Sequence, residues 1–154
     1  AKVWGVQAGY EIALLKNLIW QTKLNWVEGK ETDDVQNVQV PLRHAAPFFA
    51  STMLEYEYKE FTFQANAMYN AEISNNNLAP SEKAKTFIYA KDANGNTYSP
   101  SWFTIHAKAS YKINSIKTLL SLGCENITNQ MYRPYSSGIV AAGFNFIVSL
   151  KTSL

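Results

Sequence analysis

The chain has 154 residues, a formal net charge of +2, 17% charged residues and 14% aromatic residues. This small charge, with no run of basic residues, gives no support for a nucleic-acid partner, and no apolar run reaches the ~18 residues of a transmembrane helix. The single cysteine, Cys124, excludes an internal disulfide and fits no metal-ligand spacing. Few charges combined with many aromatic residues are unusual for a surface that faces water.

Segments in which apolar and polar residues alternate follow one another along the chain. A period of two residues predicts a β-strand with one apolar and one polar face. The predicted strands are residues 3–14, 18–28, 47–58, 61–73, 102–113, 117–125 and 143–153. Tight turns, such as Lys59-Glu60, alternate with long polar segments at 29–46, 74–101 and 126–143. Short turns at one edge and long loops at the other are typical of an up-and-down barrel of the outer-membrane type.

One face of the predicted strands carries no charged residue, and its aromatic residues lie at the strand ends. Those near the long loops are Trp4, Trp26, Phe48, Tyr69, Phe103 and Phe144; those near the short turns are Tyr10, Trp20, Tyr56, Tyr58, Phe61, Phe63 and Tyr111. Alanine and leucine fill the positions between them, such as Leu24, Ala65 and Ala107. Two aromatic girdles around an aliphatic band indicate a surface that faces lipid.

A soluble β-sandwich would show the same alternation, so it is the alternative to a membrane barrel. The predicted strands run about 10–12 residues, close to the ~9–11 of a tilted transmembrane strand and longer than the usual ~5–6 of soluble strands. A sandwich would also place its bulky side chains at mid-strand, between the two sheets. We therefore predict an all-β, antiparallel, up-and-down transmembrane β-barrel segment of about seven strands. Because so few strands leave edges unpaired in lipid, partner strands are expected from the same protein or another copy.

The order of short motifs resembles the C-terminal barrel segment of TonB-dependent outer-membrane receptors. The closest part is SPSWFTIHAKASYKINSIKTLLSLGCENITNQMYRPYSSGIVAAGFNFIVSL, with Gly-x-Glu-Asn at 123–126, Tyr-x-x-Tyr at 132–135 and an alternating apolar last strand. Upstream, VWGVQAGYEI, LNWVEGK and VPLRHAAPFF match earlier barrel strands. The chain departs from the family pattern at Ala142-Gly143-Phe144 and at the terminal Leu154.

The resemblance implies that residues 1–154 are the last seven strands of a 22-stranded barrel that an N-terminal plug occludes. It implies a location in the outer membrane of a Gram-negative bacterium, with short turns and Leu154 on the periplasmic side and long loops outside. The implied partners are membrane lipid, the remaining strands and plug, the TonB complex and a ferric siderophore or haem, with cobalamin as a less favoured ligand. The plug and the segment that contacts TonB lie outside this sequence. A passive, porin-like barrel wall without ligand specificity is the alternative.

Candidate ligand-binding residues lie in the predicted extracellular loops. They are Arg43, His44, Tyr132, Arg133 and Tyr135. A guanidinium can pair with an anionic ligand group, an aromatic ring can stack on it, and a histidine can ligate haem iron. For each of them the alternative is a structural role, in rim packing or as a solvated side chain. The loop 74–101 is long enough to close over a ligand.

A second set of candidates points to the predicted barrel lumen. It comprises His106, Lys108, Glu55 and Glu57, which would contact plug or solvent more readily than ligand. The chain has no motif of a catalytic triad, metalloprotease, redox dithiol or phosphate-binding loop. We therefore expect neither an enzyme nor a bound metal or cofactor.

Overall fold

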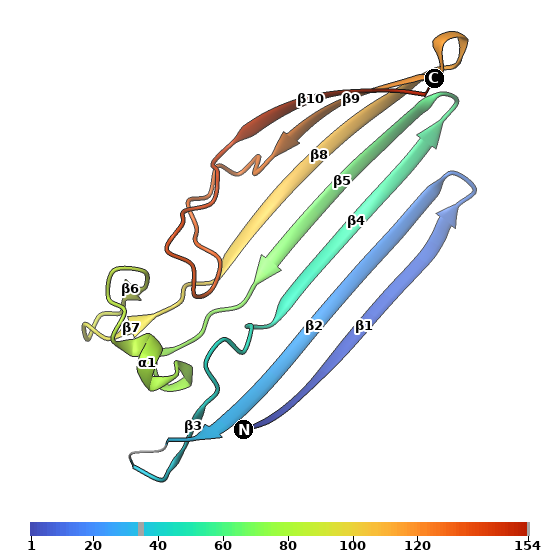
Figure 1. Ribbon diagram of the computed structural model, residues 1–154. Helices are drawn as coiled ribbons and strands as arrows, with labels where there is room; N and C mark the ends of the chain where they lie inside the picture. The colour runs from blue at the N-terminus through green and yellow to red at the C-terminus, as the bar shows by residue number, and fades with distance from the viewer. Residues whose placement is uncertain (34–35, 154) are drawn as a thin grey trace.

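The protein forms one large antiparallel sheet that carries its long loops at one end, with a small two-stranded sheet within them (Figure 1). A computed structural model describes residues 1–33 and 36–153, so Leu154 and residues 34–35 of the predicted loop 29–46 lie outside the described residues. The long strands, in spatial order, are β1 (Lys2–Leu15), β2 (Leu18–Thr32), β4 (Phe49–Tyr58), β5 (Phe61–Asn70), β8 (Trp102–Ile113), β9 (Thr118–Glu125) and β10 (Asn145–Thr152). Neighbours in sequence are neighbours in space, as predicted. The sheet does not close on itself: β1 and β10 are its edges.

Most strand bounds lie within two or three residues of the predicted ones, but the second strand is longer than predicted. β2 continues to Thr32 rather than ending at residue 28, and its last residues pair with the short strand β3 (Gln39–Pro41) through Lys30↔Pro41. The apolar alternation stops at Trp26, and Glu28 and Lys30 follow it on the same side of the strand. The face predicted to carry no charge is therefore charged at this end. The sheet therefore extends beyond its apolar band at this end.

The loops contain short elements that the alternation did not predict. They are η1 (Asn75–Asn77), α1 (Pro80–Lys83), β6 (Ala90–Lys91), β7 (Thr97–Tyr98) and, at the opposite end, η2 (Asn114–Ile116). Among the described residues, no helix has the length and apolar character needed to cross a membrane.

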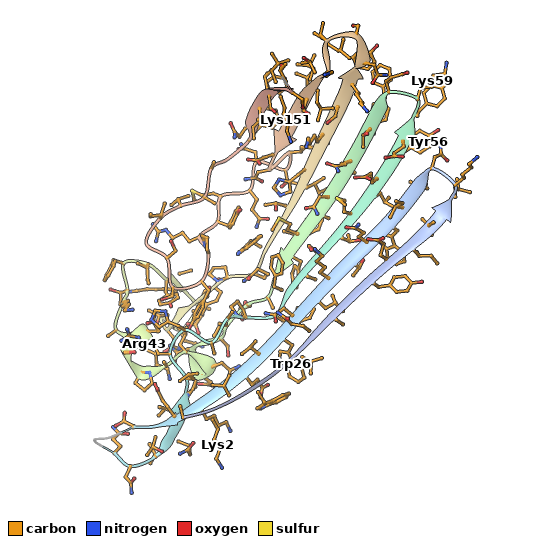
Figure 2. All side chains as sticks on the ribbon, turned by 45° about the vertical axis from the view of Figure 1, so that its right-hand side comes forward. Lys2, Trp26, Arg43, Tyr56, Lys59 and Lys151 are labelled. Carbon is orange, nitrogen blue, oxygen red and sulfur yellow. The ribbon has the colours of Figure 1, made fainter. Side chains whose placement is uncertain are left out.

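The register joins the predicted apolar positions into one continuous face. A row across five strands pairs Leu54, Ala65, Ala107, Cys124 and Phe146 in turn. Aromatic pairs lie at the two ends of this face: the rings of Trp4 and Trp26 are 4.8 Å apart, and those of Phe61 and Tyr111 are 4.6 Å apart. Figure 2 shows the same separation for Trp26 and Tyr56, which lie toward opposite ends of the strands.

No second layer covers the apolar face within the part of the chain that the structure describes. Trp4, Leu24 and Leu122 remain 52%, 40% and 45% exposed, whereas a sandwich would bury these residues against a facing sheet. The buried apolar cluster lies in the loops instead, and consists of Ile73, Leu78, Ile88 and Tyr89. The single layer therefore contradicts the sandwich alternative.

Candidate functional site

The three long connecting segments gather at one end of the sheet, where Figure 1 shows α1, β6 and β7. We call residues 42–48, 71–101 and 126–144 the loop cap. The helix α1 gives the cap its central side chain. Pro80 occupies the start of the helix, where its fixed φ and missing N–H are tolerated. The preceding Leu78 and Ala79 are buried, and this anchoring turns Glu82 inward.

Glu82 is fully buried and joins all three segments of the loop cap. Within its own segment it accepts hydrogen bonds from Lys85 Nζ at 2.6 Å and from Tyr89 Oη at 2.6 Å. From the last segment Ser136 Oγ donates at 3.2 Å, and from the first segment His44 Nε2 lies 3.8 Å from Glu82 Oε1. A buried carboxylate is costly unless it is paired and hydrogen-bonded, so these contacts favour one mutual arrangement of the segments.

The same contacts set the protonation states in the loop cap. Burial raises the pKa of Glu82, but the hydrogen bonds from Lys85, Tyr89 and Ser136 outweigh it and hold that pKa below its ordinary value. Burial, and then the hydrogen bond to Glu82, raise the pKa of Tyr89 far above its ordinary value. Burial and the Glu82 charge also raise the pKa of Tyr135. At neutral pH an anionic Glu82 therefore faces neutral phenols.

The structure places the predicted rim residues in or beside the loop cap. Tyr132 stacks on the buried Trp102 with ring centroids 4.2 Å apart. Tyr135 packs on the apolar cluster, 6.2 Å from the ring of Tyr89. These two contacts are the kind expected if Tyr132 and Tyr135 pack the rim, the structural alternative to ligand binding. Arg133 is exposed, and its Nη1 donates to the carbonyl of Phe87 at 3.0 Å; Arg43 is exposed among the loop side chains (Figure 2).

The residues predicted to face the lumen lie on the polar face of the sheet, apart from the loop cap. Glu55 accepts a hydrogen bond from Gln64 at 2.5 Å, and Gln64 pairs in register with Lys108, so these side chains form one cross-strand row. Glu57 lies near the short turns, where its backbone bonds that of Asn17. The predicted set therefore spreads along the strands and does not converge on one point.

His106 is held by hydrogen bonds on both ring nitrogens. Its Nδ1 lies 3.4 Å from the backbone N–H of Asn126, which can only donate, so Nδ1 accepts and Nε2 carries the proton toward Thr104 Oγ1 at 2.9 Å. A ring with both nitrogens engaged in this way is positioned by the protein. The contacts favour a structural role for His106.

Two organising residues were not among the predicted site residues. The sequence contained little indication of Glu82, because two of its four partners, His44 and Ser136, come from distant parts of the chain. Asn126 lies in the Gly-x-Glu-Asn motif, is buried and adopts a left-handed φ of 48°, which asparagine tolerates better than most residues. Its Nδ2 donates to the carbonyls of Gln130 and Ala142 at 2.9 and 3.0 Å, so it fastens both ends of the last long loop.

No family model and no curated protein matches the chain. Solved structures do. The copper transporter OprC matches with a TM-score of 0.77 and 16% sequence identity over 99% of this chain and 23% of OprC. The siderophore receptor PiuA from Acinetobacter baumannii matches with a TM-score of 0.60 and 16% identity over 96% of this chain and 21% of PiuA.

Both of these proteins are TonB-dependent receptors. At 16% identity the likeness shows the fold, and it confirms the predicted fold class, a segment of such a barrel. The chain spans less than a quarter of the length of either protein, 23% of one and 21% of the other.

Proposed function

We propose that the chain is part of an outer-membrane receptor that takes up a ferric siderophore with energy from TonB. In this proposal the apolar face contacts lipid, the polar face lines the lumen, and the loop cap lies outside the cell. The remaining strands, the plug and the contact with TonB come from parts of the protein beyond these residues. Haem and cobalamin are the other ligands that the sequence resemblance suggests, and no contact in the structure favours either.

One combination of features carries the proposal: the strands form an unclosed, single-layer wall, and buried contacts order the loop cap at its end. A passive wall needs loops only to connect its strands. Here a buried carboxylate, an apolar cluster and two aromatic pairs order three long segments into one body. Preorganised loops lower the conformational entropy that binding would otherwise cost. The loop cap therefore has the physical character of a binding surface.

Within the loop cap, the candidate contact surface is the exposed group around Arg133. Phe87 and Ile139 are 76% and 78% exposed. Arg133 donates to the Phe87 carbonyl, and a Cβ at Gly138 would lie 3.5 Å from Ile88 Cγ2, so the two segments run side by side here. Exposed aromatic and apolar side chains around a guanidinium suit an aromatic, anionic iron chelate.

Uptake of radioactive iron by cells that carry the complete receptor tests the proposal. We expect ferric catecholate complexes, which are aromatic and anionic, to accumulate in a TonB-dependent manner. Arg133→Ala should lower uptake at limiting ligand about tenfold or more, since a charge-assisted contact contributes roughly 1.5–3 kcal/mol. Lys91→Ala is the matched control, because it removes an exposed charge from the β6–β7 hairpin of the same loop cap, and it should leave uptake unchanged.

Diffusion assays separate this proposal from the porin-like alternative. Liposomes that contain the purified receptor should not become permeable to small sugars. Rapid swelling of those liposomes, together with uptake that does not depend on TonB, would establish the passive barrel instead. Unchanged uptake in Arg133→Ala would leave Arg133 with a packing role only.

A further inference from the structure

The β6–β7 hairpin of the loop cap carries the single Asn-Gly pair of the sequence, Asn94-Gly95. The Gly95 N–H donates to the Asp92 carbonyl at 3.0 Å, and the Asp92 N–H donates to the Asn96 carbonyl at 2.9 Å, so the turn is tight. Gly95 adopts a left-handed φ of 83°, which glycine reaches without steric cost. This turn leaves Asn94 exposed between the two short strands.

The side chain of Asn94 is free to react with the backbone that follows it. Within residues 1–33 and 36–153 only its backbone N–H is hydrogen-bonded, to Asp92 Oδ1 at 2.9 Å. A Cβ built on Gly95 would meet nothing within 4 Å, so the space around the pair is open. Asn96 differs in both respects: its Nδ2 donates to Asp92 Oδ2 at 3.2 Å, and the buried Thr97 follows it in β7.

A backbone nitrogen can attack the side-chain amide carbon of the asparagine before it and close a five-membered succinimide ring. Glycine favours this attack, because it has no Cβ to obstruct the ring and its backbone is permissive. We propose that Asn94 is a site of spontaneous deamidation in the folded protein. The proposal depends neither on the transported ligand nor on TonB.

Water is the sole co-reactant of this step, and no electrons are transferred. The Gly95 nitrogen loses its proton to water and forms a bond to Asn94 Cγ, and the amide nitrogen leaves as ammonia. Water then adds to one of the two carbonyl carbons of the ring and opens it. One opening gives aspartate, and the other gives isoaspartate, in which the main chain runs through the former side chain.

Asp92 sets the rate, because it holds the turn closed. Its Oδ1 accepts hydrogen bonds from the backbone N–H groups of Asn94 and Asn96 at 2.9 and 2.8 Å. Its carbonyl accepts the Gly95 N–H, and this bond must open before the Gly95 nitrogen can attack. Exposed loops open locally at little cost in free energy. The turn therefore slows the reaction without preventing it.

Conversion of Asn94 should weaken the attachment of the hairpin to the rest of the loop cap. The buried Thr97 makes this attachment: its Oγ1 donates to the Lys83 carbonyl at 3.1 Å, and its carbonyl accepts from Asn75 Nδ2 at 2.9 Å. Isoaspartate lengthens the main chain within the turn. Either product also adds a negative charge beside Asp92, whose pKa is held below its ordinary value by hydrogen bonds from the Asn96 backbone and side chain. Both changes oppose the pairing of β6 with β7.

Mass spectrometry of the complete receptor, digested before and after weeks of incubation at neutral pH, tests the site. We expect Asn94 to gain the mass of the amide-to-acid conversion, with isoaspartate detected by enzymatic methylation of its carboxylate. Asn96, in the same peptide, is the matched internal control and should keep its amide. Asn94→Gln should abolish the reaction, since the longer side chain cannot close a five-membered ring. Asp92→Ala should accelerate it about fivefold, because fewer hydrogen bonds then oppose opening of the turn.

An amide at Asn94 that persists in the folded receptor, but is lost in receptor unfolded in urea, would overturn the proposal. Equal conversion of Asn94 and Asn96 would also overturn it. Hydrogen exchange in residues 90–98 should be faster in Asn94→Asp than in Asn94→Gln, and equal exchange would refute the weakened attachment. None of these measurements depends on iron uptake, so a failure of the proposed function leaves their outcome unaffected.

Discussion

The strand wall and the loop cap are stabilised in opposite ways. In the wall, side chains such as Leu24 and Trp4 remain exposed, and the protein supplies only backbone pairing and cross-strand contacts. In the loop cap, Leu78 and Glu82 are completely buried, and packing and hydrogen bonds come from the chain itself. The wall therefore depends on its surroundings for the burial of apolar surface, whereas the cap carries its own small core.

This difference predicts where a substitution does harm. In the wall, the side of the sheet decides the outcome, because one face must stay apolar while the other tolerates charge. In the loop cap, the number of segments that a residue contacts decides the outcome, because Glu82 alone contacts three of them. The predictions below run from the largest expected effect to the smallest.

A charge in the middle of the apolar face should have the largest effect. Ala107→Arg adds a cation at mid-strand, between Ala65 and Cys124, and should cost about 2–4 kcal/mol of unfolding free energy in a bilayer. Asn66→Arg is the control, because Asn66 lies at the same height on the polar face, opposite His106, and should cost less than about 1 kcal/mol. Urea unfolding of the complete receptor in lipid vesicles measures both. Equal losses would contradict the assignment of the faces.

Removal of the central carboxylate should loosen the loop cap and leave the wall intact. Glu82→Ala deprives the buried Tyr89 and Ser136 hydroxyls of their acceptor, at a cost of about 1–3 kcal/mol. Hydrogen exchange should accelerate in residues 71–101 and 126–144 and stay unchanged in β4 and β5. Glu72→Ala removes an exposed carboxylate from the same segment. It should leave hydrogen exchange unchanged in both the loop cap and the strands. Faster exchange throughout the sheet would show that cap and wall unfold together.

The sequence predicted the wall much better than the cap, for a physical reason. A strand repeats one local rule, so the alternation around Phe103 and Tyr111 was enough to locate β8 at 102–113. The loop cap follows no repeating rule: Ser136 contacts Glu82 at a sequence separation of 54 residues. Tyr132, Arg133 and Tyr135 were predicted together because they share a motif, but neither their contacts with Trp102, Phe87 and Tyr89 nor the role of Glu82 could be inferred from it.

Acid should loosen the loop cap by a smaller amount than the alanine substitution. The pKa of Glu82 is lowered in the folded cap, since three hydrogen bonds outweigh burial, so its stabilising contribution is present above the ordinary glutamate pKa of about 4.3. It is lost as the pH falls through the lowered value. Because their pKa values are raised, the phenols of Tyr89 and Tyr135 beside Glu82 stay protonated throughout this range. Hydrogen exchange between pH 3 and 7, corrected for intrinsic rates, should therefore show weaker protection of residues 71–101 at the acid end.

Glu82→Gln is the control for this pH effect, because it keeps the shape and one acceptor oxygen but cannot titrate. At neutral pH, residues 71–101 of this variant should be less protected from hydrogen exchange than those of the unsubstituted protein. Their protection should not change further on acidification. An acid response that persists in Glu82→Gln would assign the effect to other carboxylates.

The smallest effect on the cap is expected at His44, a predicted rim residue whose ring lies beside the Glu82 carboxylate. Its Nε2 is 3.8 Å from the carboxylate and its side chain is 54% exposed, so the contact should contribute at most about 1 kcal/mol. His44 adopts a φ of 65°, which favours asparagine as the replacement. His44→Asn should therefore leave hydrogen exchange in the cap almost unchanged. This makes His44 the cleanest position at which to separate packing from ligand binding. A loss of iron uptake in His44→Asn, with the cap still protected, would assign His44 to the ligand, whereas normal uptake would mark it as a solvated side chain beside Glu82.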